Sequence, residues 1–228
     1  GYQRDVQQYA ELAELDPQVA PAAECFSLER AREHLLLLTE RKLSRSSILR
    51  KVSSLRAFCR FLVREEILPD NPWQGLNTPR RGRPLPKVLT VDQITGLLAA
   101  PTSYWHRVVA LGREKGNPEL AASRDTAILE LIYSGGLRIS ECLGLDFKQV
   151  DFISRVVKVR GKGKKERLCP LGRPALAALQ AYLAQRELAG QATRRQAGAL
   201  FLNQEGQRLT ARSVQRLLKT YLVEAGLP

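Results

Sequence analysis

The chain has 228 residues, of which 44% are hydrophobic, so it is long enough to bury the core of one large domain or two small ones. No apolar run approaches the ~18 residues of a membrane span, and residues 2–16 are too polar for a signal peptide, which argues against membrane and secreted proteins. Lysine and arginine outnumber aspartate and glutamate by 36 to 23, and the net charge of +13 favours a polyanionic partner such as nucleic acid.

The positive charge is gathered in three segments of the sequence. Residues 41–64 contain eight basic side chains and no acidic one, residues 80–87 contain four, and residues 155–167 contain seven beside a single glutamate. The rest of the chain is net acidic. Because a binding surface concentrates charge in this way, the distribution supports contact with nucleic acid.

Four cysteines are spread along the chain: Cys25, Cys59, Cys142 and Cys169. None forms a C-x-x-C pair, and only two histidines are present, so the spacing does not fit a zinc site. We therefore expect buried, reduced thiols in a cytoplasmic protein, and no metal.

Residues 1–68 have the pattern of a helical domain. Apolar residues at helical spacing between positions 6 and 15 predict a first helix that ends at Pro17. Ser27 fits the N-cap of a second helix that runs to about residue 41, and Ser44 fits the N-cap of a third. The third helix carries an apolar stripe at every third or fourth position: Ile48, Val52, Leu55, Cys59 and Leu62.

Three arginines, Arg56, Arg60 and Arg64, follow one another at four-residue intervals beside that stripe. Like charges at this spacing repel each other, so the ridge destabilises an isolated helix. Two interpretations stay open: the ridge is a solvated face, or it lies along phosphates. Residues 69–87 are predicted to be a linker, since five prolines and two glycines leave no room for a regular element.

A second domain is predicted over residues 88–228. Thr90 fits the N-cap of its first helix, with Gln93 in the capping-box position. Residues 101–122 are predicted to be irregular or only partly helical, because they contain Gly112, Gly116 and Pro118. The next segment, residues 125–133, reads as a buried helix that ends at a glycine pair, residues 135–136.

The remaining elements alternate between helix and strand. Helices are predicted over residues 138–145 and 174–188 and after Thr210, which fits a last N-cap. Residues 156–160 and 166–171 read as strands joined by the glycine-containing turn 161–164, and residues 200–202 as a further short strand.

Two positions could carry chemistry. Arg138 opens a helix, where free N–H groups already attract phosphate, and Glu141 is one turn further on, where it could hold the guanidinium. Lys162 lies at the tip of the predicted hairpin and could donate a proton to a leaving alkoxide. Taken singly, these features fit better a surface Arg–Glu pair and a solvated turn lysine.

Read together, the segments resemble the tyrosine recombinases of the lambda-integrase family, most closely the bacterial Xer recombinases. The resemblance rests on residues 131–145 (LIYSGGLRISECLGL) and 157–172 (VKVRGKGKKERLCPLG), with 85–90 and 55–72 in support. It implies a mainly α, two-domain fold. Residues 1–68 would form a SAM-like helical core-binding domain that binds DNA. Residues 88–228 would form the N-terminal part only of an α+β catalytic domain with a small hairpin or sheet.

The family's chemistry maps onto individual residues. Arg138 resembles the catalytic arginine that binds the scissile phosphate, Lys162 the general acid to the 5′-oxygen, and Glu141 the supporting acid. In the family a tyrosine attacks the phosphodiester and forms a 3′-phosphotyrosyl link. The resemblance implies no cofactor, double-stranded DNA as the partner, and a tetramer on DNA with itself or a paralogous recombinase.

The sequence departs from the family pattern in the motifs expected beyond residues 221–228. The family has a His-x-x-Arg motif and then the tyrosine nucleophile beyond a segment like residues 221–228, whereas the only histidines here are His34 and His106. No tyrosine of the chain is assigned as the nucleophile. We therefore expect a C-terminally truncated recombinase that binds DNA and is inactive alone.

Eight basic residues are predicted to contact DNA: Arg45, Arg56, Arg60, Arg160, Lys164, Lys165, Arg212 and Arg216. An alternative from a different class is a non-enzymatic DNA-binding protein on the same fold; a third is a basic RNA-binding protein. The target site stays open, as does the choice among chromosome partition at cell division, phage integration and cassette mobility.

Overall fold

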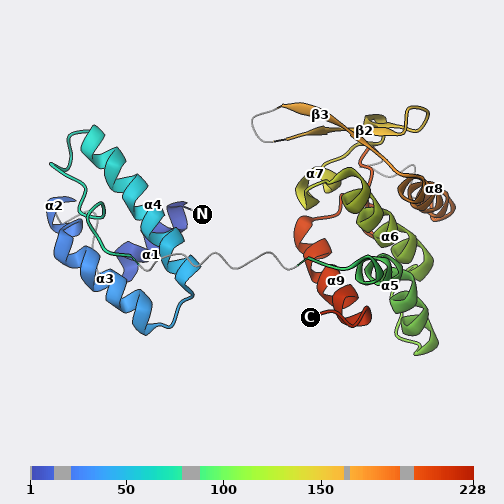
Figure 1. Cartoon of the computed structure of the whole chain (residues 1–228), viewed down its shortest axis with the longest axis horizontal. Coiled ribbons are helices and arrows are strands. Elements are labelled where there is room, and N and C mark those ends of the chain that lie inside the picture. Colours follow the sequence, from blue (N-terminus) through green and yellow to red (C-terminus); the bar gives the residue numbers. More distant parts are fainter. Residues whose placement is uncertain (1, 13–21, 79–87, 162–164, 191–197) are drawn as a thin grey trace. The chain divides into compact units, whose positions relative to one another are not determined.

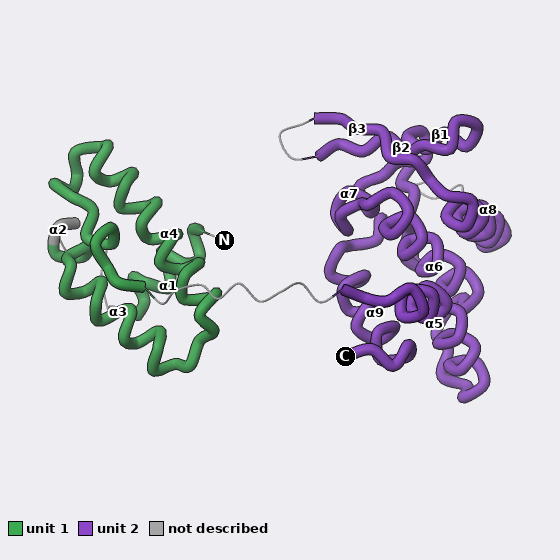
Figure 2. The backbone as a smooth tube through the Cα atoms, viewed as in Figure 1, with its two compact units in different colours: residues 1–86 green, residues 87–228 purple. Residues whose placement is uncertain are grey.

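The computed structural model describes residues 2–12, 22–78, 88–161, 165–190 and 198–228. The chain divides into two compact units, residues 1–86 and 87–228, which are coloured separately in Figure 2. Each unit has its own hydrophobic core. Within the described ranges, we find no helix that combines the length and the apolar character needed to cross a bilayer.

The described part of unit 1 contains four helices: α1 (Tyr2–Leu12), α2 (Ala22–Cys25), α3 (Leu28–Glu40) and α4 (Arg45–Arg64) (Figure 1). The two predicted N-caps are confirmed, because Ser27 Oγ accepts from the N–H of Arg30 at 3.2 Å and Ser44 Oγ from the N–H of Ser47 at 3.3 Å. The predicted end of the first helix at Pro17 lies outside the described residues.

The apolar stripe of α4 forms the centre of the unit 1 core, as predicted. It packs with Tyr9 of α1, Leu38 of α3 and the segment that follows α4. In that segment Trp73 is fully buried and Leu76 nearly so. Residues 69–78, which were predicted to begin the linker, therefore pack onto the core instead. Prolines exclude regular secondary structure but do not prevent burial. Residues 79–87 of the predicted linker lie outside the described residues.

Unit 2 has five helices in its described part: α5 (Val91–Ala110), α6 (Pro118–Gly135), α7 (Ile139–Leu143), α8 (Arg173–Leu188) and α9 (Ala211–Glu224). The capping box at the start of α5 is confirmed by reciprocal hydrogen bonds between Thr90 and Gln93. Thr210 caps α9 as predicted. Helix α6 packs against both α5 and α8 (Figure 1).

Residues 101–122, predicted to be irregular or only partly helical, are helical except over residues 111–117. Helix α5 continues through Pro101, which is buried, and α6 starts at Pro118 with Asn117 as its N-cap, so only residues 111–117 separate the two helices. A proline inside a helix removes one hydrogen bond, but the packing of α5 on α6 and α9 compensates for that loss. Pro118 occupies the first helical position, where proline is favoured.

A three-stranded antiparallel sheet covers one end of the helices. Strands β1 (Val150–Asp151), β2 (Val156–Arg160) and β3 (Glu166–Pro170) lie in the order β1-β2-β3, and the hairpin of β2 and β3 agrees with the prediction. The strand predicted over residues 200–202 was wrong. Only an isolated bridge forms there, between Leu202 and Arg208, and the carbonyls of Ala199 and Leu200 accept from the Arg186 guanidinium instead.

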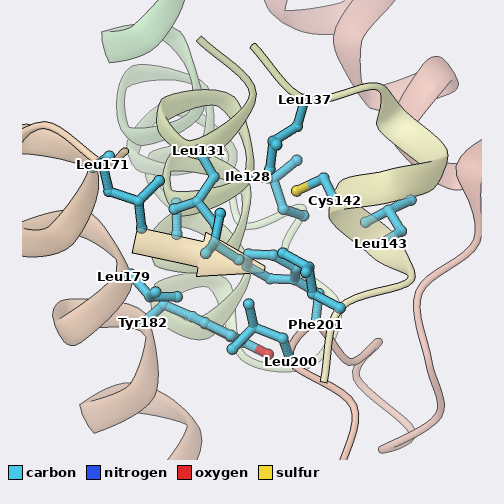
Figure 3. Packing of buried hydrophobic residues seen from close by; sticks show 14 of the residues in the cluster. Ile128, Leu131, Leu137, Cys142, Leu143, Leu171, Leu179, Tyr182, Leu200 and Phe201 are labelled. Atoms are coloured by element: carbon cyan, nitrogen blue, oxygen red, sulfur yellow. The ribbon is translucent and has the colours of Figure 1, made fainter. Parts of the chain in front are cut away.

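The core of unit 2 lies between α6, α8 and the inner face of the sheet. Figure 3 shows Ile128 and Leu131 of α6 beside Leu179 and Tyr182 of α8, with Phe201 packed among them. All four cysteines of the chain are buried, as predicted. Because α6 is fixed on two sides, the chain that leaves its C-terminus has a rigid support.

Candidate phosphate site and nucleic-acid interface

The turn between α6 and α7 places Arg138 at the surface. Helix α6 ends at Gly136, whose φ of 57° is in the left-handed region that glycine adopts without strain. Leu137 then points into the core, and Arg138, the next residue, points outward with its side chain 71% exposed. A buried leucine next to an exposed arginine fixes the backbone while leaving the guanidinium accessible.

Glu141 lies beneath Arg138 and holds it by two hydrogen bonds. Arg138 donates from Nη1 to Glu141 Oε1 at 2.7 Å and from its backbone N–H to Oε2 at 2.9 Å. The Glu141 side chain is only 5% exposed. The predicted pairing of the two residues is therefore present, and the carboxylate occupies the backbone N–H of Arg138 that was expected to be free for phosphate.

A second guanidinium, that of Arg167 in β3, reaches the same carboxylate. Its Nη2 donates to Glu141 Oε2 at 2.8 Å and to the carbonyl of Gly136 at 3.3 Å. Sequence reasoning missed this residue, although a signal was present. In the hairpin Arg167 pairs with Val159, two positions from Cys169, so it shares the inner face of the sheet. An arginine on such a face needs an acceptor.

The pKa of Glu141 lies below its ordinary value. The hydrogen bond from the Arg138 backbone contributes most to this shift, the two guanidiniums lower the pKa further, and desolvation opposes them. The carboxylate therefore stays ionised, and the cluster of two arginines and one glutamate carries a net positive charge. An exposed guanidinium fixed in this way can bind two oxygens of a phosphate in a bidentate manner.

The end of the β2–β3 hairpin also lies at this cluster. The N–H of Gly161 donates to the carbonyl of Lys165 at 2.8 Å, which closes the base of the turn. A Cβ added to Gly161 would be 3.6 Å from Glu141 Oε1. Lys162 and Lys164, two of the predicted site residues, lie outside the described residues. The residue that precedes Lys162 is thus next to the carboxylate that holds Arg138.

The other predicted DNA-contacting residues of unit 2 are exposed. Arg160 and Lys165 lie at the end of the hairpin, and Arg212 and Arg216 lie on α9, which packs against α7. Arg160 is on the outward face of the sheet, opposite Glu166. These four side chains are available to phosphate oxygens.

The predicted DNA-contacting residues of unit 1 divide into two kinds. Arg45 and Arg60 of α4 are exposed. Arg56 is half-buried and donates from Nε to the carbonyl of Trp73 at 2.7 Å and from Nη2 to that of Leu76 at 3.1 Å. The arginine ridge of α4 is therefore not a uniform solvated face, because Arg56 fastens the segment after α4 to the helix.

Comparison with known proteins identifies the family. A model described as the phage integrase family matches residues 87–228. The chain belongs to the phage integrase family. This confirms the resemblance that the motifs around Arg138 and the hairpin indicated.

Two relatives within this family carry the name tyrosine recombinase XerC. The protein from Myxococcus xanthus is 42% identical over 180 residues, which cover 78% of this chain and 55% of the relative. The protein from Syntrophus aciditrophicus is 38% identical over 199 residues, which cover 86% of this chain and 60% of the relative. The chain thus spans little more than half the length of these relatives.

Solved structures of phage integrase family members share the fold. The recombinase XerH bound to its difH substrate has a TM-score of 0.70 at 18% identity, covering all of this chain and 61% of XerH. A lambda integrase tetramer bound to a Holliday junction has a TM-score of 0.66 at 15% identity, covering all of this chain and 57% of the integrase. The predicted fold class, mainly helical with a small sheet, is confirmed.

Proposed function

We propose that this chain is the DNA-holding part of a site-specific recombinase that cleaves and rejoins DNA through a 3′-phosphotyrosyl intermediate. The observation that supports this most strongly is the exposed Arg138 guanidinium, held by a nearly buried Glu141 at the base of the hairpin that carries Lys162. A surface Arg–Glu pair without function would not need a second arginine on the inner face of a strand.

Each residue of the site has one role in the proposed reaction. Arg138 binds two non-bridging oxygens of the scissile phosphate and offsets the charge of the transition state, while Glu141 orients it. A tyrosine hydroxyl attacks phosphorus, and the 5′-oxygen leaves with a proton from Lys162. The 5′-hydroxyl of a second strand reverses the step and releases the tyrosine.

We infer that these 228 residues alone do not cleave DNA. Of the six tyrosines, Tyr9, Tyr182 and Tyr221 are buried, and Tyr221 donates to Asp125 at 2.5 Å. Burial raises the pKa of Tyr221, and the charge of Asp125 adds to that effect. None of these hydroxyls is available to a phosphate.

A nicked suicide substrate, which traps the covalent intermediate, tests this inference. We expect no protein–DNA adduct from this chain on denaturing gels. An adduct would overturn the inference, and the variants Tyr2→Phe and Tyr133→Phe would then show whether either of these exposed tyrosines had reacted. The same assay on a longer protein in which this chain is followed by a His-x-x-Arg motif and a tyrosine should give an adduct. If it does not, the alternative of a non-enzymatic DNA-binding protein is favoured.

Duplex DNA is the proposed partner, and its affinity should depend steeply on salt. The logarithm of the binding constant should fall by about 0.9 per neutralised phosphate with the logarithm of salt concentration. Replacing Arg45, Arg60, Arg160 or Arg212 by alanine should each reduce that slope by about 1, whereas Arg113→Ala is a matched control outside the predicted set. A flat salt response, or displacement by RNA at equal concentration, would contradict the proposal.

We further propose that the recombinase acts as a tetramer on DNA, with itself or with a paralogous recombinase. Two paired DNA sites allow a four-subunit assembly to be distinguished from independent binding by measuring the mass of the complex in solution. A complex that never contains more than one DNA site with its two chains, even with the longer protein, would contradict this part of the proposal.

A further inference from the structure

We propose that Arg167 is a positioning residue of the phosphate site: acting through Glu141, it orders Arg138 and gives the cluster its positive charge. This inference rests on the proposed function and deepens it. Arg167 lies in β3, far along the chain from Arg138, and its side chain is 43% exposed, so it belongs neither to the core nor to the free surface.

Arg167 ties three separate pieces of backbone together. Its Nη2 bonds to the carbonyl of Gly136, which caps α6, and to Glu141 Oε2 in α7, while its Nη1 lies 2.9 Å from Cys169 Sγ in its own strand. One guanidinium thus holds Gly136, directly before the Leu137–Arg138 pair, and Glu141, three residues after Arg138. A planar group with several fixed donors suits this task, whereas a lysine could satisfy only part of it.

The charge balance gives Arg167 a second effect. Arg138 and Glu141 alone would form a neutral pair, and a neutral pair has little attraction for a phosphate. Arg167 supplies the additional positive charge. It also accounts for one of the hydrogen bonds that lower the pKa of Glu141, after the larger contribution of the Arg138 backbone.

The same contact couples the hairpin to Arg138. Val159 pairs with Arg167, and Gly161, two residues after Val159 and just beyond the end of β2, lies beside Glu141 Oε1. A strand that is fastened to Glu141 at Arg167 therefore holds the start of the lysine-bearing turn at a fixed distance from the arginine. The position of Gly161 and the orientation of Arg138 then depend on one shared carboxylate.

The first test measures Glu141 itself and needs no DNA. Carbon-13 NMR of the Glu141 carboxyl should show its pKa rising in Arg167→Gln and staying near the wild-type value in Arg167→Lys. The nitrogen-15 signal of the Arg138 Nε–H should broaden or exchange faster in Arg167→Gln. Lys158→Gln, which removes a charge from the outward face of the same hairpin, is the matched control and should change neither signal. An unchanged Glu141 pKa in Arg167→Gln would overturn the inference.

The second test measures coupling in DNA binding. At low salt we expect Arg167→Gln to weaken duplex binding about fivefold in the wild-type background. In the Arg138→Gln background the same substitution should weaken binding less than about twofold, because the effects of residues that act through one another are not additive. Equal losses in both backgrounds would mean that Arg167 contacts phosphate directly or only maintains the fold, and would overturn the positioning role.

These two tests separate the inference from the function on which it rests. If the wild-type chain does not bind duplex DNA, the proposed function fails, while the NMR measurement still decides whether Arg167 positions Arg138. If DNA binds but Arg167→Gln leaves the Glu141 pKa and the Arg138 signal unchanged, only the inference fails. Arg167→Lys keeps the comparison valid if Arg167→Gln unfolds.

Discussion

Each unit contains a nearly buried carboxylate with two basic partners, and the two clusters have different consequences. In unit 1, Asp5 of α1 is 3% exposed and accepts from Arg50, Lys51 and Ser54. In unit 2, Glu141 is 5% exposed and accepts from Arg138 and Arg167. All partners of Asp5 lie on α4, so that cluster joins two helices of the core.

The two clusters differ in where the other hydrogen-bond donors of their basic side chains point. The Lys51 ammonium is almost buried and divides its donors between Asp5 and Gln8, both on α1. The Arg138 side chain is mostly exposed, and the partners of Glu141 come from a turn and a strand instead of one helix. The same residue types therefore stabilise the fold in one unit and leave a cation available in the other.

Removing the Asp5 charge should have the largest effect. Asp5→Asn leaves the Lys51 ammonium buried without its counter-charge, and breaking a buried pair is strongly destabilising. We expect a loss of about 3 kcal/mol in the unfolding free energy of unit 1, at the low end of the usual range because Arg50 is half exposed. Urea unfolding followed by Trp73 fluorescence in a Trp105→Phe background measures this. A loss equal to that from Glu141→Gln would remove the distinction between the clusters.

Acidification should weaken unit 1 through His34. Burial of the imidazole, with the charges of Lys51 and Arg41, lowers its pKa from 6.5 to about 4. The unfolded chain therefore binds a proton below pH 6.5 that the folded chain takes up only near pH 4, so stability falls as pH drops through this window. We expect a loss of roughly 2 to 3 kcal/mol.

The variant His34→Phe keeps a ring against Tyr9 and Trp73 and should abolish this slope. Below that pH window, unit 1 should lose further stability as Asp5 takes up a proton. Burial would raise the pKa of Asp5, but the hydrogen bonds from Arg50 and Ser54 outweigh it, so the net pKa is lowered and the stabilisation disappears as pH falls through that lower value. A slope that persists between pH 6.5 and 4 in His34→Phe would contradict the assignment.

Two arginines one turn apart on α4 provide a smaller, internal comparison. Arg56→Ala loses two hydrogen bonds from a charged donor to the carbonyls of Trp73 and Leu76, and should cost about 2 kcal/mol. Arg60→Ala, at an exposed position, should change stability by no more than about 0.5 kcal/mol and should instead weaken DNA binding. Equal losses of stability in the two variants would show that Arg56 and Arg60 contribute alike to the fold.

Features that depend on neighbouring residues could be predicted from the sequence. The caps at Ser44 and Thr90 involve N–H groups only three residues away, and the strand at residues 156–160 follows from simple alternation. The pairing of Arg138 with Glu141 is equally local, since both lie in one helical turn.

Features that depend on distant residues could not be predicted in this way. The acceptors of Arg56 are 17 and 20 residues further along the chain, and the acceptor of Arg167 precedes it by 26 residues. Helix α5 continues through Pro101 because α6 and α9 pack against it. Local helix propensity gives no information about that packing. The position of Arg167 became interpretable only once the hairpin register was known.

The smallest effect is expected on the outward face of that hairpin. Lys158 and Glu166 form an ion pair at 2.7 Å, with side chains 53% and 54% exposed, while Arg167 binds Glu141 at a similar distance on the inward face. The outer pair lowers the pKa of Glu166, but water and salt screen it.

Lys158→Ala should therefore shift the melting temperature by no more than about 2 °C, and by less at high salt. Arg167→Ala should shift it further and be less sensitive to salt, because its carboxylate partner is shielded from solvent. Equal shifts for the two variants would mean that the two faces of the hairpin do not differ in electrostatic environment, and the site at Glu141 would lose its main physical distinction from an ordinary surface pair.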